Sequence, residues 1–341
     1  WHAGPPEPSD EVVAPDMEDA VVAAALGRRL PPSVVASPVP EPPIASGSRD
    51  PGGPHLARTF DVTKTFGDDV AVDSVTVHVG SAEIVGLIGA NGAGKTTLMR
   101  MQIGLLNPTR GHVTLFGDPP SRATRRRLGY VPQGLGLYRD LTVAENFDFV
   151  ARAYGADLSL DAGLQDIADV LVADIGLGRQ RQLAFACTMS HSPELLILDE
   201  PTSGVDPISR ARLWDTIHAE AEAGVGVLVS THYMQEAEQC DRLVLMDLGR
   251  VVATGSVADI IGSTRVVQLE TLAWASAFSA LTAHDLAVSL AGTRVRVADA
   301  EPRVVQGILD AAGIRAGLDV VPATLEETMT VIARNRDTSS P

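Results

Sequence analysis

Short runs of apolar residues, separated by residues that favour turns, dominate the chain from residue 57 onward. Three short, mainly apolar runs have the length of a buried parallel strand, and they lie at residues 83–88, 195–198 and 225–229. Between the last two runs, residues 207–223 begin with Pro207 and are followed by Gly224, which predicts a helix. Strands that alternate with helices predict an α/β fold with a mainly parallel sheet.

Beyond residue 262 the pattern predicts a second, smaller α+β unit over residues 263–335, followed by a tail at 336–341. We expect strands at 265–270, 286–290, 294–297 and 318–321, and helices at 272–281, 302–312 and from Thr324 onward. This β-α-β-β-α-β order is typical of a ferredoxin-like arrangement. Thr324 and Glu327 have the spacing of a capping box for the last helix. The unit contains no cluster of catalytic residue types, which favours an interaction or regulatory role over small-molecule binding.

The first 56 residues have a different composition. Residues 28–56 are rich in Pro, Ser and Gly and carry too little apolar content to fold, so we expect a disordered linker. Residues 15–22 resemble residues 322–327, and this internal similarity suggests that residues 1–27 are the tail of an upstream copy of the same domain. An unrelated helical tail is the alternative.

Charge and cysteine content exclude several classes of protein. The chain has a net charge of −16, whereas a nucleic-acid-binding protein needs a basic surface, so we expect no nucleic-acid partner. The one basic cluster, around Arg122 and Arg125 to Arg127, is most simply a solvated helix face. Two distant cysteines predict neither a disulfide framework nor a zinc site. No apolar run reaches the roughly 18 residues that would cross a bilayer.

The loop after the first predicted strand carries the clearest chemical motif. It fits the pattern G-x-x-x-x-G-K-[ST] and stands between a strand and a helix, as a phosphate-binding loop requires. Its backbone N–H groups would surround phosphates, Lys95 would add positive charge, and the Thr96 hydroxyl would bind Mg²⁺. A chance glycine-rich turn is the alternative. The candidate nucleotide-binding residues here are Gly89, Ala90, Asn91, Gly92, Ala93, Gly94, Lys95, Thr96 and Thr97.

Polar residues at the ends of the other two predicted strands complete a candidate catalytic site. Asp199 and Glu200 directly follow residues 195–198, where Asp199 could hold Mg²⁺ and Glu200 could orient or deprotonate the attacking water. An acidic pair placed for solubility is the alternative. His232 follows the third strand and could contact the γ-phosphate, although a lone histidine is more often structural.

These motifs, in this order, resemble the nucleotide-binding domains of ABC transporters over roughly residues 57–262. The resemblance implies a P-loop NTPase (RecA-like) fold with a helical subdomain, and an ATP hydrolase that uses ATP and Mg²⁺. Phe66 resembles the aromatic residue that stacks on adenine, with a core phenylalanine as the alternative. Gln133 resembles the glutamine that touches magnesium and water and hinges against the membrane partner. Asp206 resembles the D-loop aspartate of the dimer interface, and it could also cap the following helix.

One motif departs from the family pattern. The signature Leu-Ser-Gly-Gly stands here as Ile175-Gly176-Leu177-Gly178. In the family, this loop of one subunit closes over the γ-phosphate held by the other. Gly176 lacks the serine hydroxyl, and a lost hydrogen bond to a charged group costs about 1.5 to 3 kcal/mol, so we expect a weakened half-site. The span from Gln133 to Gly178 also looks shorter than the usual helical subdomain.

The resemblance further implies partners and a location. We expect a second ABC ATPase domain, as a homodimer or as a tandem sister domain, and a separate integral membrane permease. The similarity favours an exporter of the drug-export or ABC-2 type, with this chain at the cytoplasmic face of the cell membrane. A soluble ABC ATPase that acts on ribosomes or another machine would share every ATP motif. A nucleotide-binding regulator without turnover is a further alternative.

Overall fold

The structure, a computed structural model, describes residues 55–156 and 159–337. The predictions for residues 1–27 and for the linker up to residue 54 lie outside these described residues. Within them, no helix is long and apolar enough to span a bilayer.

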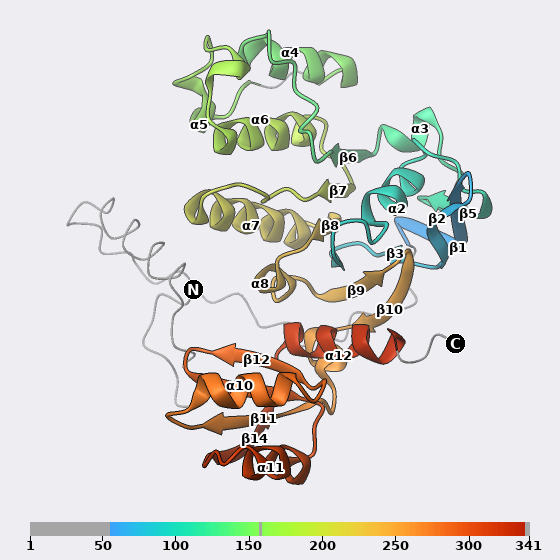
Figure 1. Cartoon of the computed structure of the whole chain (residues 1–341). Coiled ribbons are helices and arrows are strands. Elements are labelled where there is room, and N and C mark those ends of the chain that lie inside the picture. Colours follow the sequence, from blue (N-terminus) through green and yellow to red (C-terminus); the bar gives the residue numbers. More distant parts are fainter. Residues whose placement is uncertain (1–54, 157–158, 338–341) are drawn as a thin grey trace.

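A six-stranded sheet of order β10-β9-β4-β8-β7-β6 forms the centre of the part of the chain that precedes residue 262 (Figure 1). Neighbouring strands are parallel, except that β10 runs antiparallel to β9. The strands are β4 (Ile84–Ile88), β6 (Leu128–Val131), β7 (Leu195–Asp199), β8 (Gly226–Thr231), β9 (Arg242–Asp247) and β10 (Arg250–Gly255). Every residue of β4, β7 and β8 is buried, which explains why these strands are mainly apolar, with polar residues only at the carboxyl ends of β7 and β8.

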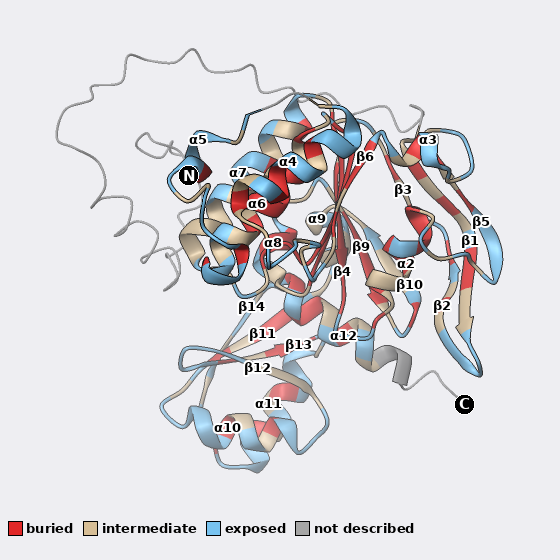
Figure 2. Ribbon diagram, turned by 90° about the horizontal axis from the view of Figure 1, so that it is seen from above, coloured by how far each residue is buried: buried red, intermediate tan, exposed pale blue. Residues whose placement is uncertain are grey.

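A smaller antiparallel sheet lies beside the central one. It consists of β1 (Ala57–Phe66), β2 (Asp69–Val75), β3 (His78–Val79) and β5 (Arg110–Leu115). Helix α2 (Lys95–Gln102) packs between the two sheets, and its residues Leu98 and Met99 are fully buried in one core with Leu87 of β4 and Leu115 of β5. Figure 2 shows that buried positions concentrate in the central strands. This packing fixes the start of α2 against the end of β4.

The remaining helices before residue 262 either pack on one another or cover the central sheet. They are α3 (Arg122–Arg125), α4 (Val143–Tyr154), α5 (Ala162–Gln165), the 3-10 helix η1 (Val172–Asp174), α6 (Leu177–Met189), α7 (Pro207–Glu222), α8 (Met234–Ala237) and α9 (Val257–Ile261). Helices α4, α5 and α6 share a core around Phe147 and Leu183. Trp214 and Ile217 of α7 pack on β8. Burial raises the pKa of the Cys187 thiol in α6 to about 12, so this thiol is unreactive.

The basic cluster is only partly the solvated helix face that was predicted. Helix α3 contains Arg122 and Arg125 but ends before Arg127. The Arg127 guanidinium instead lies 3.9 Å from the centre of the Phe116 ring and donates to Glu194 at 2.6 Å. Arg127 therefore joins β6 to the start of β7 through an exposed ion pair.

The C-terminal unit contains the strands and helices in the predicted order. They are β11 (Arg265–Glu270), α10 (Trp274–Thr282), β12 (Ala287–Ala291), β13 (Arg294–Ala298), α11 (Pro302–Ala311), β14 (Gly317–Pro322) and α12 (Leu325–Asp337). The strands form an antiparallel sheet of order β12-β13-β11-β14. Helices α10 and α11 pack on the core of Val267, Leu269 and Val295. Helix α12 packs on Val266 and Ala298, and it also contacts the central sheet (Figure 1).

A buried ion pair fixes the start of α12. The Glu327 carboxylate accepts hydrogen bonds from Arg296 Nε at 2.7 Å and Ser289 Oγ at 3.0 Å. Glu327 N donates to Thr324 Oγ1 and Thr324 N donates to Glu327 Oε2, which confirms the predicted capping box. Burial raises the pKa of Glu327, but the hydrogen bonds from Arg296 and Thr324 outweigh it and lower this pKa to about 2.

We expect Glu327→Gln to lower the free energy of unfolding by about 2 kcal/mol at pH 7, because Arg296 loses its charged acceptor. The pKa of Glu327 falls on folding, from 4.5 to about 2, so its contribution is present above pH 4.5 and is lost as the pH falls toward 2. Urea unfolding between pH 7 and pH 3 should therefore show the two proteins converging. The exposed neighbour variant Glu326→Gln is the control, and an equal effect of both variants would contradict the prediction.

Candidate functional site

The candidate residues meet at one edge of the central sheet. Strand β4 pairs in parallel with β8, and β8 pairs in parallel with β7. The carboxyl ends of these strands therefore lie side by side, and they lead into the loop from Gly89, the Asp199–Glu200 pair and His232. Ligands of open α/β sheets bind at this edge.

Two glycines of the loop have backbone positions that no other residue could occupy. Gly94 has a φ of 97° and caps α2, and a Cβ at this position would lie 2.5 Å from the Ala71 carbonyl oxygen. At Gly89 a Cβ would lie 2.3 Å from the carbonyl oxygen of Met246. The loop thus fits between β2 and β9 only without these side chains, and it leads directly into the N-terminus of α2, which attracts anions.

Lys95 folds back over this loop. Its Nζ donates to the carbonyl oxygens of Gly89 at 2.6 Å and Ala90 at 3.0 Å, and the side chain is almost fully buried. Burial lowers the pKa of Lys95, while the nearby carboxylates of Glu200 and Asp199 raise it. The ammonium group is therefore held next to the phosphate-binding loop by backbone oxygens that phosphate oxygens could replace.

The Asp199 carboxylate joins three of these segments. Its Oδ1 accepts hydrogen bonds from Ser230 Oγ at 2.7 Å and Thr96 Oγ1 at 3.2 Å. Ser230 Oγ also accepts a hydrogen bond from Glu200 N at 3.0 Å. Ser230 was not predicted from the sequence, although its position two residues before His232, at the end of an apolar strand, was a signal.

The donors around Asp199 fit a magnesium ion. Asp199 Oδ2 is buried and has no hydrogen-bond partner among the described residues, and the Thr96 hydroxyl is next to the same carboxylate. Mg²⁺ prefers such oxygen ligands and is usually held by one or two protein groups together with phosphates and water. The described residues contain no cluster of three or more His, Cys, Asp or Glu side chains that could hold a metal, so any such ion would need phosphate or water ligands.

Glu200 stands between the other two predicted residues. Its Oε2 accepts a hydrogen bond from Gln133 Nε2 at 3.3 Å and lies 3.6 Å from His232 Nδ1. His232 Nδ1 is buried without a hydrogen bond among the described residues. The backbone of Glu200 is left-handed, with a φ of 49°, which is costly for a residue with a side chain and is common at functional sites. Gln133, which was also predicted to bind the metal, therefore contacts Glu200 here rather than Asp199.

Phe66 is available for stacking. It ends β1, its side chain is 52% exposed, and Lys64 Nζ lies 5.2 Å from the centre of the ring. The alternative interpretation as a core phenylalanine is therefore wrong.

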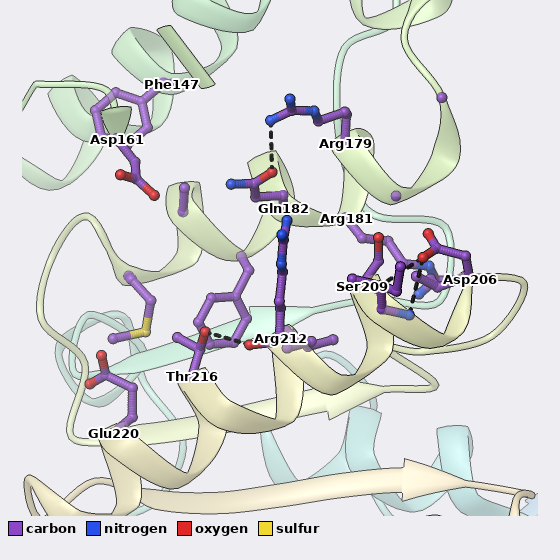
Figure 3. A pocket seen from close by; sticks show the side chains of 18 of the residues that line it. Phe147, Asp161, Arg179, Arg181, Gln182, Asp206, Ser209, Arg212, Thr216 and Glu220 are labelled. Atoms are coloured by element: carbon purple, nitrogen blue, oxygen red, sulfur yellow. Dashed lines mark hydrogen bonds between the residues drawn. The ribbon is translucent and has the colours of Figure 1, made fainter. Parts of the chain in front are cut away.

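Gly176, Gly178 and Asp206 form a second group. They line a cavity of about 720 Å³ between α6 and α7, whose lining includes no residue of the phosphate-binding loop (Figure 3). Gly176 caps α6, and a Cβ at Gly178 would lie 3.7 Å from Asp206 Oδ2. Asp206 also caps α7 by accepting hydrogen bonds from Ile208 N and Ser209 N, so the capping interpretation is confirmed. The candidate residues thus divide into two groups.

Known proteins resemble this chain in sequence and in structure. A family profile described as ABC transporter matches residues 72–203. The chain is 41% identical over 221 residues to the "Probable multidrug ABC transporter ATP-binding protein YbhF" of Escherichia coli (strain K12), which covers 61% of this chain and 38% of that protein. It is 39% identical over 216 residues to the "Nod factor export ATP-binding protein I" of Burkholderia thailandensis, which covers 59% of this chain and 71% of that protein. The chain thus spans well under two thirds of the first relative.

Solved structures agree with the sequence matches. A structure described as the ATP-binding subunit of an ABC transporter superimposes with a TM-score of 0.55 at 30% identity, over 60% of this chain and 91% of that one. A nucleotide-free ATP-binding cassette from an ABC transporter gives a TM-score of 0.51 at 20% identity, over 59% of this chain and 91% of that one, and it supports the fold alone. The predicted ABC-type P-loop fold is confirmed.

We expect Phe66→Ala to raise the Kd for ATP by roughly tenfold or more, because stacking on a base contributes about 1 to 3 kcal/mol. Phe66→Trp keeps an aromatic face and should leave the Kd within about threefold of the wild-type value. Titration with a fluorescent ATP analogue measures both. Equal affinities of the Ala and Trp variants would show that Phe66 does not stack on the nucleotide.

Proposed function

Because this chain belongs to the ATP-binding proteins of ABC transporters, we propose that it binds and hydrolyses ATP to power a separate membrane permease. The observation that carries the proposal is the Asp199 cluster, in which one carboxylate joins the phosphate-binding loop to the strand that precedes His232. Glu200 lies directly beside this cluster.

In this proposal the nucleotide binds across the edge of the central sheet. The adenine stacks on Phe66, and the β- and γ-phosphates take the place of the carbonyl oxygens that now accept hydrogen bonds from Lys95. The N–H groups of residues 89–94 and the N-terminus of α2 add further donors. Thr96 and Asp199 would hold Mg²⁺, which supplies positive charge next to the phosphate oxygens when it is bound.

Hydrolysis follows from the position of Glu200. Its carboxylate accepts a proton from water as the water oxygen bonds to the γ-phosphorus, and the bond to the bridging β-γ oxygen breaks to release ADP and phosphate. Gln133, which donates to Glu200 Oε2, orients this water. His232, 3.6 Å from the same oxygen, contacts the γ-phosphate. The left-handed backbone of Glu200 fixes the base on this side of the sheet.

We further propose that two such domains act together, as a homodimer or with a tandem sister domain. The separate position of Gly176, Gly178 and Asp206 supports this arrangement, because these residues would close over a nucleotide bound by the other domain. In this arrangement, residues 57–262 form the ATP-binding domain and residues 263–335 form a ferredoxin-like accessory domain. The relatives named for multidrug transport and Nod factor export favour an ABC-2-type exporter with this chain at the cytoplasmic face of the membrane.

The test of the proposed reaction is Glu200→Gln. We expect the rate of ATP hydrolysis to fall at least about 100-fold, because the general base is lost, while ATP binding remains. Glu222→Gln, at the exposed end of α7, is the matched control and should hydrolyse ATP at the wild-type rate. Phosphate release from the purified proteins gives the rates. Equal rates of Glu200→Gln and the wild type would remove Glu200 from its role.

The altered signature allows a gain-of-function test. Gly176 has ordinary backbone angles, φ −64° and ψ 155°, and a Cβ there would meet no atom within 4 Å. Gly176→Ser should therefore fold normally and restore the hydroxyl group, raising the hydrolysis rate by about tenfold. Gly176→Ala has the same backbone without the hydroxyl and should show no increase. Identical rates of the Ser and Ala variants would show that the missing hydroxyl does not limit the reaction.

A further inference from the structure

Arg181 is a buried arginine on the second turn of α6, and the functions described so far do not use it. Its Nη1 donates to the carbonyl oxygens of Glu200 at 2.9 Å and Pro201 at 2.6 Å, and its Nη2 donates to the carbonyl oxygen of Ser203. The side chain is 8% exposed. One guanidinium group thus binds the main chain at three points of the turn that begins with the proposed catalytic base.

The surroundings keep this guanidinium charged and in place. Glu236 of α8 is 2% exposed, its carboxylate lies 3.5 Å from Arg210 Nε, and its negative charge acts on Arg181. Burial lowers the pKa of Arg181, while Glu200 and Glu236 raise it, and an arginine stays protonated under either influence. The planar guanidinium group has several N–H donors in fixed directions and can bind several fixed acceptors at once. The single ammonium group of a lysine cannot match this geometry.

The turn at Glu200 needs such support. A left-handed backbone at a residue with a side chain is unfavourable and persists only where neighbouring groups hold it. Ser230 holds the N–H group of Glu200, through its hydroxyl and its carbonyl oxygen, and Arg181 holds the carbonyl oxygen. The two main-chain polar groups of the proposed base are therefore fixed by two different elements, β8 and α6.

Arg181 also connects the two groups of site residues. Helix α6 begins just after Gly176 of the altered signature, and Figure 3 shows Arg181 beside Asp206 and Ser209 at the start of α7. We propose that Arg181 is a positioning residue that holds the Glu200 turn in its working conformation and couples it to the position of the signature helix. This inference rests on the proposed ATP hydrolysis.

The test is Arg181→Lys in the full chain, which keeps the charge but not the fork of donors. We expect kcat for ATP hydrolysis to fall by roughly tenfold or more while KM for ATP changes less than about twofold, because the base and not the nucleotide is displaced. Arg212→Lys, an exposed arginine of α7 on the same cavity, is the matched control and should retain both values. If Arg181→Lys does not fold, Arg181→Gln, which keeps two planar N–H donors, replaces it.

A second measurement separates positioning from general stabilisation. If Arg181 acts through Glu200, Arg181→Lys should cause no further loss of the residual rate in a Glu200→Gln background. The same fold loss in both backgrounds, or a kcat equal to that of Arg212→Lys, would overturn the inference while leaving ATP hydrolysis in place. A wild-type chain without ATPase activity would instead overturn the proposed function, and this inference with it.

Discussion

The hydrogen bonds from Thr96 and Ser230 to one oxygen of Asp199 hold the site together. They join the start of α2 to the ends of the parallel strands β7 and β8, and each comes from a different segment of the chain. A buried carboxylate is unfavourable unless it is hydrogen-bonded, and the two hydroxyl groups supply hydrogen bonds to Asp199 inside the protein. The second oxygen has no hydrogen-bond partner among the described residues, which supports the proposed Mg²⁺ site at this edge of the sheet.

Glu200 occupies the next position but has a different environment. Asp199 still belongs to β7, whereas Glu200 turns away in a left-handed conformation and contacts Gln133 and His232. The two adjacent carboxylates therefore have different surroundings. Asp199 lies among hydroxyl groups, and Glu200 lies between the amide of Gln133 and the imidazole of His232. This separation depends on backbone geometry, since the two side chains differ by a single methylene group.

Much of the fold followed from local patterns in the sequence. Strands β4, β7 and β8 were predicted to within two residues because both of their faces are buried, and α7 was bounded correctly by Pro207 and Gly224. Helix α10 begins at Trp274, two residues later than predicted, because Thr271 accepts a hydrogen bond from Ala273 N and forms a turn first. Such side-chain turns compete with helix formation and leave no periodic signal.

The candidate site was only partly predictable. The phosphate-binding loop and the acidic pair have fixed spacing, whereas Phe66 and Gln133 were recognised through a family resemblance. Ser230 and Arg181 were not predicted, because a serine in a strand and an arginine on a helix form no motif of distinctive spacing. Their hydrogen-bond partners also lie 19 to 31 residues away in sequence. The left-handed turn at Glu200 also leaves no trace in composition.

Helix α12 packs against both the central six-stranded sheet and the C-terminal four-stranded sheet. Its residues Leu325, Met329 and Ile332 pack with Ile88, the residue directly before the phosphate-binding loop, while Val331 packs on the C-terminal sheet. A chain shortened before α12 would expose apolar surface on both units at once. The boundary at residue 262 therefore separates the sheets of the two units but not their hydrophobic contacts. We expect the two units to unfold partly together.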